Sequence, residues 1–204
     1  MPAMLRCWSP TLAWACLLAA ATAAERTPGG IGTADWPGWR GPTHDGRAVA
    51  DQDVPLTWSA TDNLLWTADV PGRGTSSPTV VGDRVYLTSC DEAAGSQSVH
   101  AFDRRTGRLA WSRVVHASGA MRKHEKSTGA SASVACDGER LFVAFPTAGA
   151  VEITALAFTG EPLWQARLCD YRIHQGYGAS PLVHGDAVIA VADHHGGGAV
   201  AAFD

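Results

Sequence analysis

The sequence predicts an all-β fold made of repeated units of four short antiparallel strands. Residues 77–111 contain four extended segments separated by turn residues, and two weaker copies follow, which is the sign of a repeat architecture. The segments Gly107–Trp111 and Gly160–Trp164 have the same spacing in consecutive copies. Charged residues make up only 18 % of the chain, beside 22 Gly and 8 Trp. This composition suits short strands and tight turns better than long helices.

Net charge and the first residues limit the classes of function. A formal charge of −4 provides no basic footprint for phosphate binding, so we expect no nucleic-acid partner. Residues 1–24 combine Arg6, an apolar run over 11–21 and small residues around Ala23, the pattern of a secretory signal peptide. The run is shorter than the roughly 20 residues that span a bilayer. We therefore predict a periplasmic or secreted protein with no membrane span after signal removal.

Residues 25–62 are predicted to form an irregular lead-in and docking arm. Residues 35–42 place two tryptophans, two prolines and two glycines in eight positions, which excludes regular structure and favours a rigid turn laid on an apolar surface. A second interpretation makes Trp39 and Arg40 a platform for a ligand.

Three cysteines, Cys90, Cys136 and Cys169, remain after the predicted signal peptide. Their spacing does not suggest a zinc site, and it leaves any disulfide pairing among them open. We predict buried, unreactive thiols and no metal site.

The repeated region covers residues 63–204 and begins with an isolated strand. Residues 63–70 repeat only the last strand of a unit, with Trp66 at the position of the later tryptophans. In the first complete unit, Gly107 provides the positive φ of a tight turn, and Asp103 accepts backbone N–H bonds across that turn. The predicted elements are a lone strand at 63–70, units at 76–115 and 130–168, and an incomplete unit at 179–204.

A family resemblance rests on the pattern Ala101-Phe102-Asp103-x-x-Thr106-Gly107-x-Leu109-x-Trp111, preceded by Ser77-Pro78 and Gly82-Asp83. It resembles the repeat of the pyrroloquinoline-quinone-like β-propeller superfamily. Residues 35–42, 124–140 and 176–181 are similar to the exported propeller proteins common in planctomycete-type bacteria. The resemblance implies that the units are blades and that tryptophans dock between them. The residues of this structural blade motif are Trp66, Asp103, Gly107, Trp111, Gly160 and Trp164.

The resemblance also implies an incomplete ring. A ring of this superfamily needs about six to eight blades, and the chain provides two complete ones with parts of two others. We expect a partial β-propeller of four-stranded antiparallel blades, the N-terminal fragment of a longer protein. Connections between blades lie at one mouth of a propeller, where function concentrates.

The connections between blades carry the candidate ligand-binding residues His124, Lys126, His174 and Tyr177. We expect His124 and His174 to face a common channel from adjacent blades. The alternatives are a solvated charged loop and ordinary hydrogen bonding at the rim. Asp193 and His195 share a face of an extended segment, which is weak support for a structural metal. No catalytic residue is predicted.

The predicted function is that of an exported, non-catalytic binding or scaffold module without a cofactor. Its partner would be a protein, a glycan or a small ligand at one propeller face. The alternative is the N-terminal part of a pyrroloquinoline-quinone-dependent alcohol or sugar dehydrogenase. The resemblance implies that such enzymes hold the quinone with calcium, acidic and amide ligands, and often a vicinal disulfide. No such set can be matched in this sequence, which has no adjacent cysteine pair.

Overall fold

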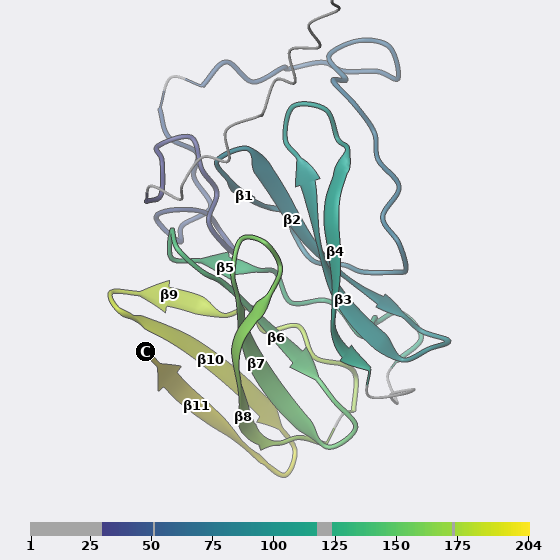
Figure 1. Ribbon diagram of the computed structural model, residues 1–204, viewed down its shortest axis with the longest axis vertical. Coiled ribbons are helices and arrows are strands. Elements are labelled where there is room, and N and C mark those ends of the chain that lie inside the picture. The colour runs from purple at the N-terminus through teal and green to yellow at the C-terminus, as the bar shows by residue number, and fades with distance from the viewer. Residues whose placement is uncertain (1–29, 51, 118–123, 173) are drawn as a thin grey trace, which may run out of the picture.

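The structure is a computed structural model and describes residues 30–50, 52–117, 124–172 and 174–204 (Figure 1). The predicted signal peptide, residues 1–24, lies outside these ranges. No helix within them is long and apolar enough to cross a membrane. The strands of the described residues are β1 (Thr79–Val81), β2 (Arg84–Asp91), β3 (Ser96–Asp103), β4 (Leu109–Ala117), β5 (Ala135–Cys136), β6 (Leu141–Pro146), β7 (Ala150–Leu156), β8 (Pro162–Asp170), β9 (Leu182–His184), β10 (Ala187–His194) and β11 (Gly197–Phe203).

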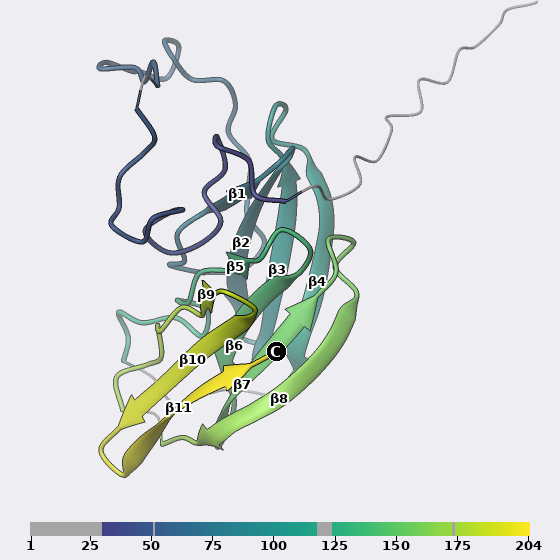
Figure 2. The same cartoon turned by 90° about the vertical axis from the view of Figure 1, so that its left-hand side faces the viewer.

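The strands form three antiparallel sheets in which neighbours along the chain pair with each other. Their orders are β1-β2-β3-β4, β5-β6-β7-β8 and β9-β10-β11, and we call them blades 1, 2 and 3. This arrangement confirms the predicted all-β class with antiparallel units of three or four strands. Blades 1 and 2 each begin with a strand of three or two residues and end with one of nine. Blade 2 lies between the other two (Figures 1 and 2).

Blade 2 is the centre of the core because both of its faces are covered. All six residues of β6 are buried, whereas β8 alternates between exposed and partly buried residues. A strand covered on both faces needs apolar side chains at consecutive positions, which explains the run Leu141–Phe145. One face of blade 2 packs against Tyr86 and Val99 of blade 1. The other packs against Val188 and Ala190 of blade 3.

The tryptophans at the start of the last strands pack on the following blade. Trp111 in β4 donates its Nε1–H to the carbonyl oxygen of Phe158 at 2.9 Å. A Cβ atom at Gly160, where φ is 85°, would lie only 2.9 Å from the Trp111 ring. Glycine therefore permits both the turn and the close approach of the indole. Trp164 in β8 packs on Phe203 of blade 3, with ring centroids 5.8 Å apart.

Trp66 docks on blade 1 in the same way, although the strand predicted around it is not formed. Its Nε1–H donates to the carbonyl oxygen of Arg104 at 2.9 Å, and a Cβ atom at Gly107 would lie 2.5 Å from its ring. No β-ladder of the described chain includes residues 63–70, which differs from the prediction of a lone strand. A strand needs a hydrogen-bonded partner along its edge, whereas one indole can dock alone.

The turn before β4 is organised by Asp103. Its Oδ1 accepts the backbone N–H groups of Arg105 at 3.2 Å and Thr106 at 2.8 Å. It also accepts the Thr106 hydroxyl at 2.7 Å. These hydrogen bonds, first from the Thr106 hydroxyl and then from its N–H, lower the pKa of the Asp103 carboxyl. The carboxylate thus replaces the backbone partners that the turn cannot provide.

The arm crosses the first strands of blades 1 and 2. Trp36 exchanges two backbone hydrogen bonds with Val80 of β1, at 2.7 and 2.9 Å. The Pro37 carbonyl oxygen then accepts the N–H of Cys136 in β5 at 2.8 Å. The Asp35 carboxylate accepts the N–H of Gly82 at 2.9 Å. The arm is therefore fixed through the backbone edges of two consecutive blades.

The described thiols differ in burial. Cys90 and Cys136 are buried and Cys169 is partly buried. Burial raises the pKa of the Cys136 thiol to about 12, so at neutral pH it is protonated and a poor nucleophile. Cys136 and Cys169 are thiols rather than members of a disulfide.

His100 is a buried polar residue of blade 1, and both of its ring nitrogens are hydrogen bonded. Ser89 donates its hydroxyl to the Pro71 carbonyl oxygen, so at 2.7 Å its oxygen accepts the Nε2–H of His100. His100 Nδ1 is then unprotonated and accepts the Ser112 hydroxyl at 2.9 Å. This chain of hydrogen bonds joins β2, β3 and β4 to the segment that enters blade 1.

The buried His100 makes stability depend on pH. Burial lowers the pKa of His100, so below about pH 6.5, the ordinary histidine pKa, the unfolded chain binds a proton that the folded chain resists. Stability is therefore expected to fall as the pH falls from 7 toward 5, and burial of His116 acts in the same direction. The slope from one proton is at most about 1.4 kcal/mol per pH unit. Urea unfolding at a series of pH values measures it.

The matched variants for this experiment are His100→Gln and His184→Gln. His100→Gln removes the buried imidazole and is expected to flatten the slope. His184 is exposed at the end of β9, and His184→Gln is expected to keep the slope of the wild type. A slope that His100→Gln leaves unchanged would contradict the assignment.

Candidate functional site

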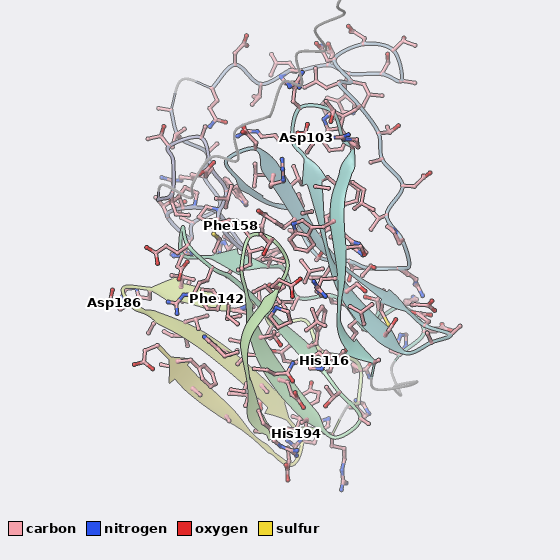
Figure 3. The ribbon with its side chains drawn as sticks, in the orientation of Figure 1. Asp103, His116, Phe142, Phe158, Asp186 and His194 are labelled. Atoms are coloured by element: carbon pink, nitrogen blue, oxygen red, sulfur yellow. The ribbon has the colours of Figure 1, made fainter. Side chains whose placement is uncertain are left out.

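The predicted connections between blades form a rim at one end of the molecule. The rim is built from the β8–β9 connection, the β10–β11 turn and the segment 124–129 before β5. Figure 3 shows His194 of the β10–β11 turn at the opposite end of the molecule from Asp103. The two ends of the blades therefore present separate surfaces.

Two tyrosines form the floor of the rim. Tyr171 and Tyr177 meet edge to face, with ring centroids 5.6 Å apart and an interplanar angle of 84°. Tyr171 donates its hydroxyl to the Gly176 carbonyl oxygen at 3.0 Å, and Tyr177 donates to that of Val191 at 2.9 Å. Tyr177 was predicted as a ligand contact, but its side chain is buried and its hydroxyl is engaged. It supports the rim from below because its ring is needed to fill the space between blades 2 and 3.

The adjacent histidines of the β10–β11 turn point in different directions. His194 packs edge to face on Tyr171 at 5.2 Å. Its Nδ1 accepts the N–H of Gly196 at 3.1 Å, so its Nε2–H donates to the Asp170 carbonyl oxygen at 3.1 Å. His195 instead meets the ring of His174 edge to face, with centroids 5.2 Å apart. His194 thus fixes the turn, and His195 is presented to solvent.

A cavity of about 340 Å³ opens between these two loops. Its walls include the exposed polar side chains of Arg172, His174, Gln175, Asp193 and His195. Arg172 has no ion-pair partner among the described side chains. The cavity therefore presents the Arg172 cation, imidazoles and the Asp193 carboxylate beside the Tyr171 ring. The unpaired guanidinium is the group in it that can bind a carboxylate.

His124 and Lys126 lie beside this cavity rather than within it. The N–H of His124 donates to the carbonyl oxygen of Gln175 at 3.2 Å, which joins the two connections predicted to share a rim. His124 Nδ1 accepts the N–H of Lys126 at 3.1 Å, so the imidazole closes a local turn. Lys126 is exposed, with no ion-pair partner in the described ranges. At this cavity His174 meets His195, and His124 is not among the lining residues. A channel shared by His124 and His174 stays a prediction.

The acidic side chains of the described residues do not gather into a metal cluster. Within the described ranges, no group of three or more His, Cys, Asp or Glu side chains is placed to hold a metal ion. Asp193 and His195 line the rim cavity without a third such ligand in that arrangement. The dehydrogenase interpretation stays an alternative prediction.

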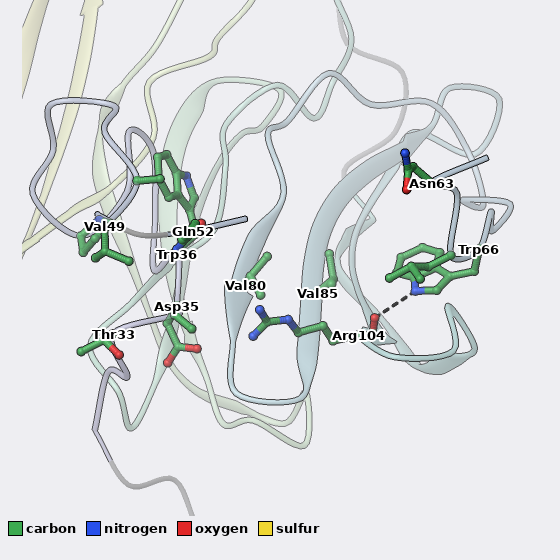
Figure 4. A pocket seen from close by; sticks show the side chains of 14 residues that line it. Thr33, Asp35, Trp36, Val49, Gln52, Asn63, Trp66, Val80, Val85 and Arg104 are labelled. Atoms are coloured by element: carbon green, nitrogen blue, oxygen red, sulfur yellow. Dashed lines mark hydrogen bonds between the residues drawn. The ribbon is translucent and has the colours of Figure 1, made fainter. Parts of the chain in front are cut away.

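A second cavity, of about 450 Å³, lies between the arm and blade 1 (Figure 4). Trp36 and Trp66 line it with Asn63, Val80 and Arg104. Sequence reasoning did not identify this cavity, because it joins segments that are distant along the chain.

The residues proposed from the sequence as a platform lie elsewhere on the arm. Trp39 is 55 % exposed, and the Arg40 guanidinium donates to the Asp45 carbonyl oxygen at 3.2 Å. Neither lines the second cavity. A Cβ atom at Gly41, where φ is 78°, would lie 2.7 Å from the Trp36 ring. Gly41 is closer in sequence to Trp39 than to Trp36, so no local signal identifies Trp36 as the fixed indole.

Comparison with protein-family models identifies the repeat. A family model described as "Outer membrane protein assembly factor BamB" matches residues 22–122 and 95–204. Among solved structures, a europium-containing methanol dehydrogenase is 19 % identical with a TM-score of 0.49, and BamB from Moraxella catarrhalis is 16 % identical with a TM-score of 0.48. Each alignment covers 69 % of this chain, which spans 25 % and 40 % of those two chains, respectively. The search of curated proteins gave no significant match.

Proposed function

Because the chain belongs to the pyrroloquinoline-quinone-like β-propeller repeat family of the outer membrane protein assembly factor BamB type, we propose that it is a non-catalytic binding module of the cell envelope. The BamB description supports an envelope location, and the predicted signal peptide adds to that support. The module binds an acidic segment of a protein partner at the rim. Binding requires only the exposed side chains of the rim and no bound cofactor.

The observation that carries this proposal is the joining of two connections into one rim with two exposed cations, Lys126 and Arg172, beside the carboxylates of Glu125 and Asp193. The hydrogen bond from His124 to Gln175 brings Lys126 beside the cavity that Arg172 lines. Neither cation is neutralised by a described carboxylate within ion-pair distance. Exposed cations of this kind pair with carboxylates through charge-assisted hydrogen bonds, and they also attract acidic partners by electrostatic steering.

An acidic peptide tests this rim directly. The probe is a fluorescein-labelled decapeptide of alternating Asp and Gly, and anisotropy measures its binding to the full-length protein. The double variant Lys126→Gln, Arg172→Gln is expected to weaken binding roughly tenfold, equivalent to about 1.4 kcal/mol. Its melting temperature is expected to stay near that of the wild type, because exposed substitutions usually change stability by less than about 0.5 kcal/mol.

The matched control removes charge at the other end of the molecule. The double variant Arg105→Gln, Arg108→Gln changes the exposed turn after Asp103, far from the rim (Figure 3). It is expected to bind the peptide as the wild type does. Equal losses in the two double variants, or no measurable peptide binding, would exclude the rim as an acidic-peptide site.

The dehydrogenase alternative has its own test. Full-length protein is incubated with pyrroloquinoline quinone and calcium, and reduction of an electron-accepting dye is followed with alcohols and sugars. The binding-module proposal expects no turnover above a heat-denatured control. Sustained turnover would replace it with the enzyme interpretation.

A further inference from the structure

The cavity between the arm and blade 1 has the features of a ligand site separate from the rim (Figure 4). Its volume of about 450 Å³ is within the range of about 300–1,000 Å³ typical of small-molecule sites. It lies beside Arg104, which follows Asp103 at the end of the molecule opposite His194 (Figure 3). A ligand bound there would not touch the rim residues.

Two half-buried indoles line this cavity, and each packs closely against a glycine. Gly41 lies against the ring of Trp36, and Gly107 against that of Trp66. The Trp36 backbone is bonded to Val80 on β1, and the Trp66 Nε1–H is bonded to the Arg104 carbonyl oxygen at 2.9 Å. Both indoles are therefore in place before any ligand arrives, which lowers the ordering cost of binding.

The polar groups of the cavity retain hydrogen-bonding capacity. The Arg104 guanidinium makes one hydrogen bond of 3.4 Å, to the Gly82 carbonyl oxygen, and has no ion-pair partner among the described side chains. Its other N–H donors are available to a carboxylate. Asn63 donates from Nδ2 to the Thr57 carbonyl oxygen at 2.8 Å, which leaves its Oδ1 as an acceptor.

The acidic residue of the cavity is already engaged. Asp35 accepts the backbone N–H of Gly32 with one carboxylate oxygen, at 2.8 Å, and that of Gly82 with the other, at 2.9 Å. The Asp35 carboxylate therefore fixes the arm in place and does not pair with Arg104. The polar side chains that remain for a ligand are consequently one guanidinium, the exposed amides of Asn63 and Gln52, and the exposed hydroxyl of Thr33.

We propose that this cavity binds an acidic sugar, a pyranose that carries a carboxylate. The C–H face of a pyranose packs on an indole, its hydroxyl groups pair with amides, and its carboxylate accepts two parallel N–H bonds from Arg104. A purely apolar ligand would leave the guanidinium and the amides unpaired, which costs binding energy. A neutral sugar offers the guanidinium only hydroxyl oxygens, which form weaker hydrogen bonds with it than a carboxylate does. The sugar can be free or part of a polymer, because the cavity is open to solvent.

Titration calorimetry with digalacturonate and its neutral counterpart, digalactose, tests the proposal on the full-length protein. Digalacturonate is expected to bind saturably at millimolar concentration and roughly tenfold more tightly than digalactose, because one charge-assisted pair is gained. Arg104→Gln is expected to remove that tenfold preference, so that digalacturonate binds no more tightly than digalactose. Arg108→Gln, an exposed arginine of the same turn that does not line the cavity, is expected to keep the preference.

Trp36→Leu separates stacking from charge. This variant is expected to lower the affinity for both sugars by a similar factor of roughly ten, because both lose the indole surface. If this variant unfolds, Arg104→Gln and Arg108→Gln still decide the question. Three results would overturn the proposal. They are a lack of saturable binding at millimolar digalacturonate, equal affinity for the two sugars, and equal losses of affinity in the two arginine variants. The acidic-peptide assay at the rim is independent, so failure of one site does not imply failure of the other.

The length of the sugar distinguishes its source. Equal affinities for galacturonate and trigalacturonate per binding site would support a single free sugar in the cavity. A higher affinity for trigalacturonate would support a polymer that extends beyond it. Both interpretations require that Arg104→Gln lowers the affinity for the acidic sugar. An unchanged affinity in this variant would overturn both.

Discussion

Replacing Trp111 with alanine is expected to lower the free energy of unfolding by about 3 kcal/mol. Replacing a buried Trp or Phe with alanine typically lowers the free energy of unfolding by about 3–5 kcal/mol. The lower end applies here because Trp111 is partly exposed. The variant loses the hydrogen bond to the Phe158 carbonyl oxygen. It also opens space beside Tyr86, whose ring centroid lies 6.0 Å from that of Trp111. Urea unfolding measures the loss as a lower midpoint.

The matched control is Trp58→Ala, which removes an indole that is 74 % exposed on the arm. Its cost is expected to stay within about 0.5 kcal/mol. A Trp111→Ala midpoint equal to that of Trp58→Ala would contradict the docking of Trp111 between blades 1 and 2.

Gly107→Ala is expected to destabilise the protein by about 3 kcal/mol. Two costs add at this position. A non-glycine residue held at positive φ costs about 1–3 kcal/mol, and φ at Gly107 is 70°. The new methyl group would also lie 2.5 Å from the Trp66 ring, and overpacking of this kind costs typically about 1–3 kcal/mol. The midpoint of urea unfolding reports the sum.

Gly82→Ala separates the two costs, because Gly82 has a similar φ of 55° and a methyl group added there would meet no atom within 4 Å. It is expected to cost about 1 kcal/mol, from backbone strain alone. The difference between the two variants is the contribution of the Trp66 contact. No difference would mean that Trp66 moves freely and does not dock on Gly107.

The sequence was sufficient for features that depend on local patterns. Turn glycines and alternating strands repeat along the chain, so the all-β class could be predicted before any contact was known. The spacing that Gly107–Trp111 shares with Gly160–Trp164 indicated the repeat, and the motif within residues 101–111 carried the family resemblance. These signals lie within a few residues of one another, which makes them readable without the tertiary structure.

Features that depend on distant partners could not be predicted. Residues 63–70 carry the composition of a strand, but a strand also requires a paired edge. Tyr177 has the amphipathic side chain of a ligand contact, and only the packing of blade 3 shows that it is buried. The choice between Trp36 and Trp39 at the second cavity depends on the bridge of Trp36 to Val80. Each of these outcomes is decided by chain segments that lie far apart in the sequence.

The crossing of the arm over two blades affects the order of folding. Trp36 emerges early during synthesis, but Pro37 bonds to Cys136, which is made much later. The arm can be locked only after β5 has formed, because closing so long a loop has an entropic cost that the final contacts must offset. Until then its apolar residues are available to wrong partners. In the finished protein the same crossing means that blade 1 cannot release the arm without disturbing blade 2, so the two blades are expected to unfold as one cooperative unit.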